Sequence, residues 1–343
     1  MDFEIRLSGR TDPEAAASYA RWAEELGAMS IWSSEAGCDP FLPLVPVAMA
    51  TRKIEIGTGI AVAFGRSPYA TAQSAWYLHR ISAGRMVLGL GTQVKAHIER
   101  RYGMPWYGAG NALAEYIDCI REIWRSWRDR NSPNFVGKHW QATLSNPEFS
   151  PAPLPDGTGP IPVWIASVGP TLLRIAARAA DGVNFHAFTT PEYLQATLHP
   201  AIEASRSEAG IVKPMRTGCC VFSGVVHDDQ QLKTMQAHFR GIIAFYGSTP
   251  TYQPVLESIG YGDLMPKLRD LSRDRAWNKM AELIPDELVN RMVIMDSPAE
   301  LGRRMVARYG HVLDQISIFR GGDQFMSNKD WETLVQSVKL APQ

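Results

Sequence analysis

The sequence lacks the features that mark membrane, nucleic-acid-binding or disulfide-bonded proteins. Its 35 Lys and Arg residues equal its 35 Asp and Glu residues, so its charge does not favour a polyanionic partner such as nucleic acid. No run approaches about 18 apolar residues, and we therefore expect no membrane span. Its four cysteines form no CxxC or CxxH pair. Because the first residues are acidic and no long apolar run follows them, we expect reduced thiols in a cytoplasmic protein.

Several signatures of catalytic or cofactor-binding sites are also absent. The sequence has no GxxxxGK[ST] or GxGxxG motif that would hold a nucleotide phosphate, and no GxSxG motif of a hydrolase nucleophile. It has no HExxH motif or paired His and carboxylate spacing, so we expect no metal. It does contain 343 residues, of which 45% are hydrophobic, enough to bury a large core.

Short apolar runs alternate with helical patterns along the chain, which indicates βαβ units and an α/β fold. Helices are predicted at 13–26, 40–50, 68–81 and 115–127. Strands are predicted at 3–7, 29–33, 53–62, 86–90, 162–166, 182–186, 218–226 and 314–319. Eight parallel strands are typical of a (β/α)8 TIM barrel, and a doubly wound open sheet is the alternative.

Two connections are longer than a barrel needs. Residues 91–161 follow the fourth predicted strand, and residues 227–313 follow the seventh. We interpret both as insertions on a single barrel domain that spans residues 1–343. Because loops at the carboxyl ends of barrel strands carry function, we expect substrate specificity to depend on these insertions.

Reactive groups in a TIM barrel lie at the carboxyl ends of the strands. Glu35 follows the second predicted strand, His97 follows the fourth and His186 ends the sixth. A carboxylate or an imidazole whose pKa lies near neutrality can transfer a proton. Glu35, His97 and His186 are therefore the candidate catalytic residues.

A tight turn joins the fifth predicted strand to the next helix. It contains Ser167, Val168 and Gly169, and Pro170 occupies the start of the helix. Free backbone N–H groups at such a helix start can bind a phosphate, although an ordinary turn with Pro in the first position gives the same pattern. Strands three and four also carry glycines where β-branched residues are expected, which indicates a bulge or close approach of a flat ligand, with a plain turn as the alternative.

At these segments the sequence resembles the bacterial luciferase-like superfamily of flavin- and deazaflavin-dependent TIM-barrel oxidoreductases. The resemblance covers nearly the whole chain and is most specific in residues 23–34, 56–68, 82–93, 115–124 and 162–182. Residues 41–44, 65–68 and 93–101 resemble the branch assigned to coenzyme F420 more than luciferase itself.

The resemblance implies a cofactor, coenzyme F420 or alternatively FMN, in the mouth of the barrel. Its phosphate would lie at residues 167–169, and its ring would pack on a bulge that contains a cis peptide bond between Gly59 and Ile60. The cofactor-binding residues it implies are Gly59, Ile60, Gly91, Thr92, Gln93, Val94, Ser167, Val168 and Gly169. A homodimer is also implied.

One departure from the superfamily limits what can be carried over. Its sugar-phosphate dehydrogenases have a catalytic His directly after the acidic residue that ends strand two, where this chain has Ala36, and their strand-four carboxylate is Val94 here. From the resemblance to the F420 branch we expect hydride transfer between coenzyme F420 and an unidentified small organic molecule. The alternatives are an FMN-dependent monooxygenase that uses oxygen and a non-catalytic flavin-binding barrel.

Overall fold

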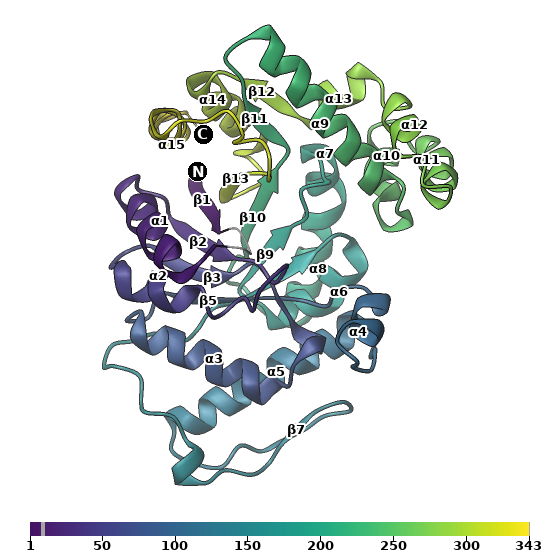
Figure 1. Ribbon diagram of the computed structural model, residues 1–343. Helices are drawn as coiled ribbons and strands as arrows, with labels where there is room; N and C mark the ends of the chain where they lie inside the picture. Colours follow the sequence, from purple (N-terminus) through teal and green to yellow (C-terminus); the bar gives the residue numbers. More distant parts are fainter. Residues whose placement is uncertain (8–10, 343) are drawn as a thin grey trace.

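Parallel strands form a closed barrel at the centre of the molecule, as Figure 1 shows. The computed structural model describes residues 1–7 and 11–342. The barrel strands are β1 (Asp2–Leu7), β2 (Ser30–Ser33), β3 (Glu55–Thr58), β4 (Ala61–Val62), β5 (Met86–Gly91), β8 (Val163–Ser167), β9 (Gly182–Phe185), β10 (Arg216–Val221) and β13 (Gln315–Ile318). β3 pairs with both β2 and β5, and β4 continues beside β5, so β3 and β4 together fill one of eight barrel positions. This closure confirms the predicted TIM barrel and excludes the open sheet.

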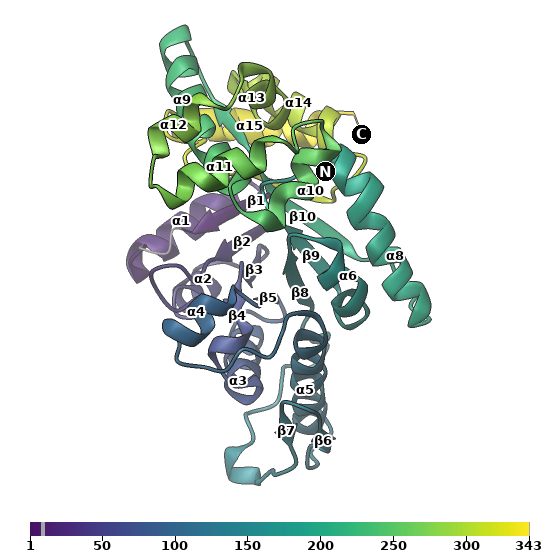
Figure 2. The ribbon, with the colours of Figure 1, turned by 90° about the vertical axis from the view of Figure 1, so that its right-hand side faces the viewer.

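Helices surround the barrel on its outside (Figures 1 and 2). They are α1 (Pro13–Glu25), α2 (Leu44–Ala50), α3 (Pro68–Ile81), α5 (Gly110–Arg128), α6 (Pro170–Ala176), α8 (His199–Glu208), α14 (Pro298–Tyr309) and α15 (Asn328–Leu340). Their starts follow local rules: the Asp12 carboxylate accepts the N–H of Ala15 at 2.9 Å, and Pro13 occupies the first turn of α1. No helix in the described part of the chain has the length and hydropathy needed to cross a bilayer.

The first long connection lies between β5 and β8. It contains α4 (Lys95–Arg100), α5, a hairpin of β6 (Phe135–Val136) and β7 (Gln141–Ala142), and the short helix η2 (Pro147–Phe149). The second lies between β10 and β13 and contains α9 (Asp229–Gly247), η5 (Pro250–Tyr252), α10 (Gln253–Ser258), α11 (Leu264–Arg273), α12 (Trp277–Glu282) and α13 (Asp286–Met292), followed by α14. Helices α9–α13 and the β6–β7 hairpin lie at opposite ends of the molecule in Figures 1 and 2.

Shorter elements complete the connections. They are η1 (Ala63–Gly65), η3 (Ala177–Ala179), α7 (Pro191–Tyr193), η4 (Leu194–Leu198), β11 (Ser223–Val225) and β12 (Ile294–Asp296). The predicted strand 218–226 is wrong as one unit, because β10 pairs inside the barrel whereas β11 leaves it and pairs with β12. The predicted strand 53–62 is likewise divided into β3 and β4.

The boundaries of two predicted helices also change. The helix predicted at 40–50 begins at Leu44, because the Asp39 carboxylate accepts the N–H groups of Phe41 and Leu42 at 2.8 and 3.2 Å and holds a turn there. The helix predicted at 115–127 starts earlier, at Gly110. Neither change alters the order of strands and helices around the barrel.

The barrel interior centres on two tryptophans. Trp32 and Trp164 are buried, and their ring centroids lie 5.3 Å apart. Glycines face both rings: a Cβ on Gly57 would lie 2.6 Å from the Trp32 ring, and one on Gly182 would lie 2.2 Å from the Trp164 ring. The indoles therefore fill space that the strand glycines leave.

Candidate functional site

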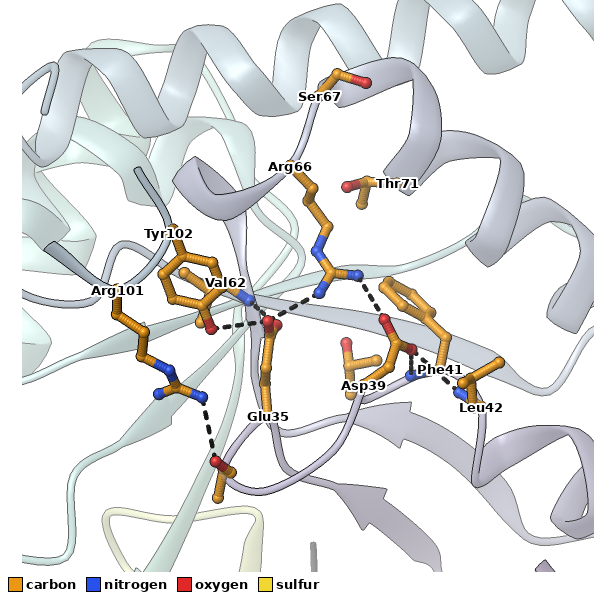
Figure 3. A network of polar contacts seen from close by, with 12 residues as sticks. Glu35, Asp39, Phe41, Leu42, Val62, Arg66, Ser67, Thr71, Arg101 and Tyr102 are labelled. Atoms are coloured by element: carbon orange, nitrogen blue, oxygen red, sulfur yellow. Dashed lines mark hydrogen bonds and ion pairs between the residues drawn. The ribbon is translucent and has the colours of Figure 1, made fainter. Parts of the chain in front are cut away.

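Glu35 lies just after β2 and connects three segments at the carboxyl end of the barrel (Figure 3). Its Oε1 accepts hydrogen bonds from the Arg66 guanidinium and the Tyr102 hydroxyl, both at 2.8 Å. Its Oε2 accepts the backbone N–H of Val62 at 2.7 Å, and its own N–H donates to the Ile60 carbonyl at 3.2 Å. The side chain is only 6% exposed. The carboxylate is thus occupied by donors of the protein itself.

A second acid extends this arrangement. Arg66 also pairs with Asp39 at 3.2 Å, and its guanidinium lies 5.2 Å from the centre of the Phe41 ring. Burial, and then the hydrogen bond to Glu35, raise the pKa of Tyr102 above its ordinary value, so the phenol stays protonated and donates. Two loops and the end of α4 are therefore held together at the barrel mouth, as Figure 3 shows.

The break between β3 and β4 is a bulge next to β5. The peptide bond between Gly59 and Ile60 is cis, at the position the resemblance implies. A Cβ on Gly91 would lie 2.8 Å from the Ile60 side chain, and one on Gly89 would lie 1.9 Å from the Thr58 carbonyl oxygen. These β5 glycines therefore make room for the protein's own bulge.

The turn before α6 leaves an open helix start. Gly169 is the N-cap of α6, and no side chain caps the helix. Apart from its two chain neighbours, no described residue has an atom within 4 Å of where a Cβ on Gly169 would be. The Ser167 hydroxyl donates to the Gly169 carbonyl at 3.0 Å, so it tightens the turn. First-turn N–H groups have no partner inside a helix, and an anion can bind there.

His186 lies beside this turn, since its N–H donates to the Ser167 carbonyl at 3.2 Å. Its Nδ1 accepts the N–H of Phe188 at 3.0 Å, so the neutral ring carries its proton on Nε2. Burial lowers the pKa of His186 to about 4, which keeps the ring neutral at pH 7. Its ring lies 4.6 Å from Tyr246 and 4.9 Å from Tyr252, centroid to centroid, both contributed by the second long connection.

The remaining predicted residues are less enclosed. His97 and Val94 are exposed, at the start of α4, and Val94 is 58% exposed. Thr92 and Gln93 are half-buried, and Gln93 has a φ of 57°. Within the described residues, no hydrogen bond or ring contact joins the His97 side chain to Glu35 or His186. The structure therefore brings Glu35 and the bulge together, places His186 beside the residue 167–169 turn, and leaves His97 apart.

Comparison with known proteins decides the family. Residues 2–315 match the luciferase-like monooxygenase family. The chain belongs to this family. An uncharacterized protein of Mycobacterium tuberculosis is 36% identical over 85% of this chain and 86% of its own length. A second M. tuberculosis protein, a proposed coenzyme F420-dependent oxidoreductase, is 27% identical over 89% of this chain and 90% of its own.

Solved structures share the luciferase-like barrel. The coenzyme F420-dependent tetrahydromethanopterin reductase of Methanopyrus kandleri superposes with a TM-score of 0.79 at 19% identity, covering 98% of both chains. The oxygenating constituent of 3,6-diketocamphane monooxygenase of Pseudomonas putida, solved with FMN, has a TM-score of 0.70 at 16% identity and covers 100% of both chains. Proteins of this fold thus include a coenzyme F420-dependent reductase and a monooxygenase solved with FMN.

The residues of this luciferase-like barrel fit a phosphate-bearing ring cofactor. The uncapped α6 start with free space beside Gly169 suits a phosphate, and the bulge at Ile60 offers a surface for a flat ring. No group of three or more His, Cys, Asp or Glu in the described part of the chain could hold a metal ion.

Several residues that shape the site were not predicted. Arg66 and Tyr102 orient Glu35 from 31 and 67 residues away, a distance at which sequence patterns carry no information. Glu4 and Arg6 lie inside the barrel, and here a signal existed. In β1 the apolar residues Phe3, Ile5 and Leu7 are buried in the core, and charged residues alternate with them. Alternation in a barrel strand places those charges on the inner face.

Proposed function

We propose that this protein transfers a hydride between coenzyme F420 and a small organic substrate at the mouth of the barrel. The observation that carries the proposal is the open start of α6 at Gly169, located in the same rim as the bulge at Ile60. The F420-dependent oxidoreductase proposed in M. tuberculosis, which matches 89% of this chain, supports the choice of deazaflavin. When bound, this cofactor supplies a two-electron hydride carrier.

In this proposal the cofactor phosphate is held by backbone N–H groups of the residue 167–169 turn and α6. Such groups bind an anion without lysine or arginine. The ring packs on Ile60, with residues 91–94 along its other edge. The Glu35 carboxylate keeps Ile60 and Val62 in place through the contacts of 3.2 and 2.7 Å described above. Glu35 is therefore a positioning residue rather than the proton donor.

His186 is the residue best placed to contact a substrate. The imidazole presents an Nε2–H and cannot become charged near neutral pH, because its pKa is about 4. It can orient a carbonyl or hydroxyl oxygen by donating a hydrogen bond, while water supplies or accepts the net proton. Tyr246 and Tyr252 pack on the imidazole ring and come from the second long connection, so this connection contributes to substrate choice.

Oxygen dependence tests the proposal against the FMN-dependent alternative. Reduced F420 is mixed under argon with the protein and a panel of ketones, aldehydes, imines and alkenes, and the return of the oxidised deazaflavin spectrum is followed. The proposal predicts cofactor oxidation that needs a substrate and proceeds without oxygen. A reaction that requires reduced FMN and consumes oxygen would identify a monooxygenase instead. No reaction with either cofactor, despite binding, would favour a flavin-binding barrel.

A further inference from the structure

A charged pair lies inside the barrel, where branched apolar residues are usual. Glu4 is 1% exposed, and its Oε1 accepts hydrogen bonds from the Arg6 guanidinium and, at 2.9 Å, from the Ser317 hydroxyl. The same Arg6 nitrogen, Nη2, donates to the Asn184 side-chain oxygen at 3.0 Å. Glu4 on β1 and Asn184 on β9 therefore hold the guanidinium directly, and Ser317 on β13 holds the Glu4 carboxylate.

Glu4 and Arg6 lie at different depths in the barrel. Arg6 lies two residues beyond Glu4 on β1, which places it about 6.6 Å closer to the carboxyl end. Its guanidinium lies 5.9 Å from the Trp32 ring centre, and its Nη1 would be 2.8 Å from a Cβ on Gly59. The positive end of the pair therefore lies beside the bulge and the Trp32 ring, and Glu4 lies closer to the amino end of the barrel.

The guanidinium keeps its charge in this setting. Burial disfavours the charge, but the Glu4 carboxylate, with smaller contributions from Cys220 and Cys219, raises the pKa of Arg6 above its ordinary value. Several polar atoms of the cluster have no partner among the described residues, namely Glu4 Oε2, Arg6 Nε and Asn184 Nδ2. Buried polar atoms are normally paired, so unpaired ones inside the barrel point to a polar ligand or ordered water nearby.

We propose that the positive charge of Arg6 makes the protein bind reduced deazaflavin more tightly than the oxidised form. The inference rests on the proposed function. Reduction adds a hydride, which is two electrons and one proton, so the ring gains one negative charge unless it takes up a second proton. A fixed positive charge beside the bulge favours that extra negative charge. Glu4 moderates the effect because its opposite charge lies deeper in the barrel.

The dissociation constants of oxidised and reduced F420, measured anaerobically by calorimetry, test this role without turnover. Arg6→Met keeps the side-chain length but removes the charge, and it should raise the ratio of the reduced to the oxidised constant about tenfold. This change corresponds to a midpoint potential lower by about 30 mV. Glu4→Gln keeps the oxygen that accepts from Arg6 and should lower the same ratio.

The matched control is at the other end of the barrel. Arg216 pairs with Glu55 at 3.0 Å and lies 5.4 Å from the Trp164 ring centre, so it repeats the pairing of Arg6 away from the mouth. Arg216→Met should leave the ratio unchanged.

If Arg6→Met fails to fold, Glu4→Gln decides the question. An unchanged ratio in Arg6→Met, or a raised ratio in Glu4→Gln, overturns this inference but leaves the proposed function standing. Wild-type protein that binds neither form of F420 overturns the proposed function and this inference with it.

Discussion

The Glu35 carboxylate accepts the backbone N–H of Val62 at 2.7 Å and so ties the loop after β2 to the strand that follows the Gly59–Ile60 bond. The same carboxylate pairs with Arg66 at 2.8 Å. A strand-end acid that resembled a proton donor is therefore part of the scaffold of the barrel mouth. This assignment separates groups that hold the mouth in shape from groups that face a substrate.

Removing the Glu35 carboxylate should destabilise the protein. Glu35→Ala leaves Arg66 without its buried partner and the Val62 N–H without an acceptor, and we expect a loss of about 3 kcal/mol in the free energy of unfolding. Glu35→Gln keeps an acceptor for Val62 and should lose about half as much. Urea unfolding measures both values. Equal stability of wild-type protein and Glu35→Ala would contradict the positioning role.

The two kinds of glycine at the mouth should respond differently to alanine. Gly89→Ala places a Cβ 1.9 Å from the Thr58 carbonyl oxygen, so we expect a loss of about 3 kcal/mol or more, measured by thermal or urea unfolding. Gly169→Ala meets open space and should change the free energy of unfolding by less than about 0.5 kcal/mol. Its Cβ would occupy the phosphate position, so cofactor affinity should fall about tenfold. Unchanged affinity in Gly169→Ala would place the phosphate elsewhere.

The buried His186 should make the stability depend on pH. Its folded pKa is about 4 and its ordinary value is 6.5, so between these values the unfolded chain binds a proton that the folded chain does not. Stability should therefore fall as the pH drops from about 6.5 to about 4, by up to about 3 kcal/mol from this residue. The difference in unfolding free energy between wild-type protein and His186→Gln, measured by urea at pH 7.5 and 4.5, isolates this contribution. A pH-independent difference would show that His186 has the same pKa in the folded and the unfolded chain.

The two candidate histidines should differ in catalysis. His186→Ala should lower kcat/KM about 10- to 100-fold, because it removes the Nε2–H donor and a lost hydrogen bond to substrate costs about 1.5–3 kcal/mol. Because wild-type His186 does not titrate near neutrality, the pH profile between 6 and 8 should keep its shape in the variant. His97→Ala changes an exposed side chain and serves as the control at wild-type rate. The reverse order of effects would move the substrate-binding role to His97.

The barrel could be predicted because its signal is local. Apolar runs, helix caps and the spacing of strands repeat along the chain, and they determine the order of elements. The exchange of partner after Val221 could not be predicted, because β10 and β11 are equally apolar and differ only in which distant strand they meet. The position of the bulge followed from glycines and resemblance, whereas the reason for Gly91, contact with the Ile60 side chain, needed the fold.

The positions of the candidate site residues could also be predicted from the sequence, whereas their roles could not. Strand-end positions identified Glu35, His186 and the residue 167–169 turn as rim residues, since the rule depends only on where strands end. Their roles depend on distant partners: Tyr102 contacts Glu35 from the turn after α4, and Tyr246 packs on His186 from α9. Sequence periodicity does not encode such contacts. In β1, charged residues alternate with apolar ones, and this pattern would have predicted charged side chains inside the barrel.

Equilibrium titration with coenzyme F420 and with FMN, side by side, tests the central claim most directly. Quenching of tryptophan or cofactor fluorescence gives the two dissociation constants for the wild-type protein and for Gly169→Ala. The account predicts that F420 binds more tightly than FMN, and that Gly169→Ala weakens F420 binding without loss of stability. Tight binding of FMN together with no response to F420 would contradict it.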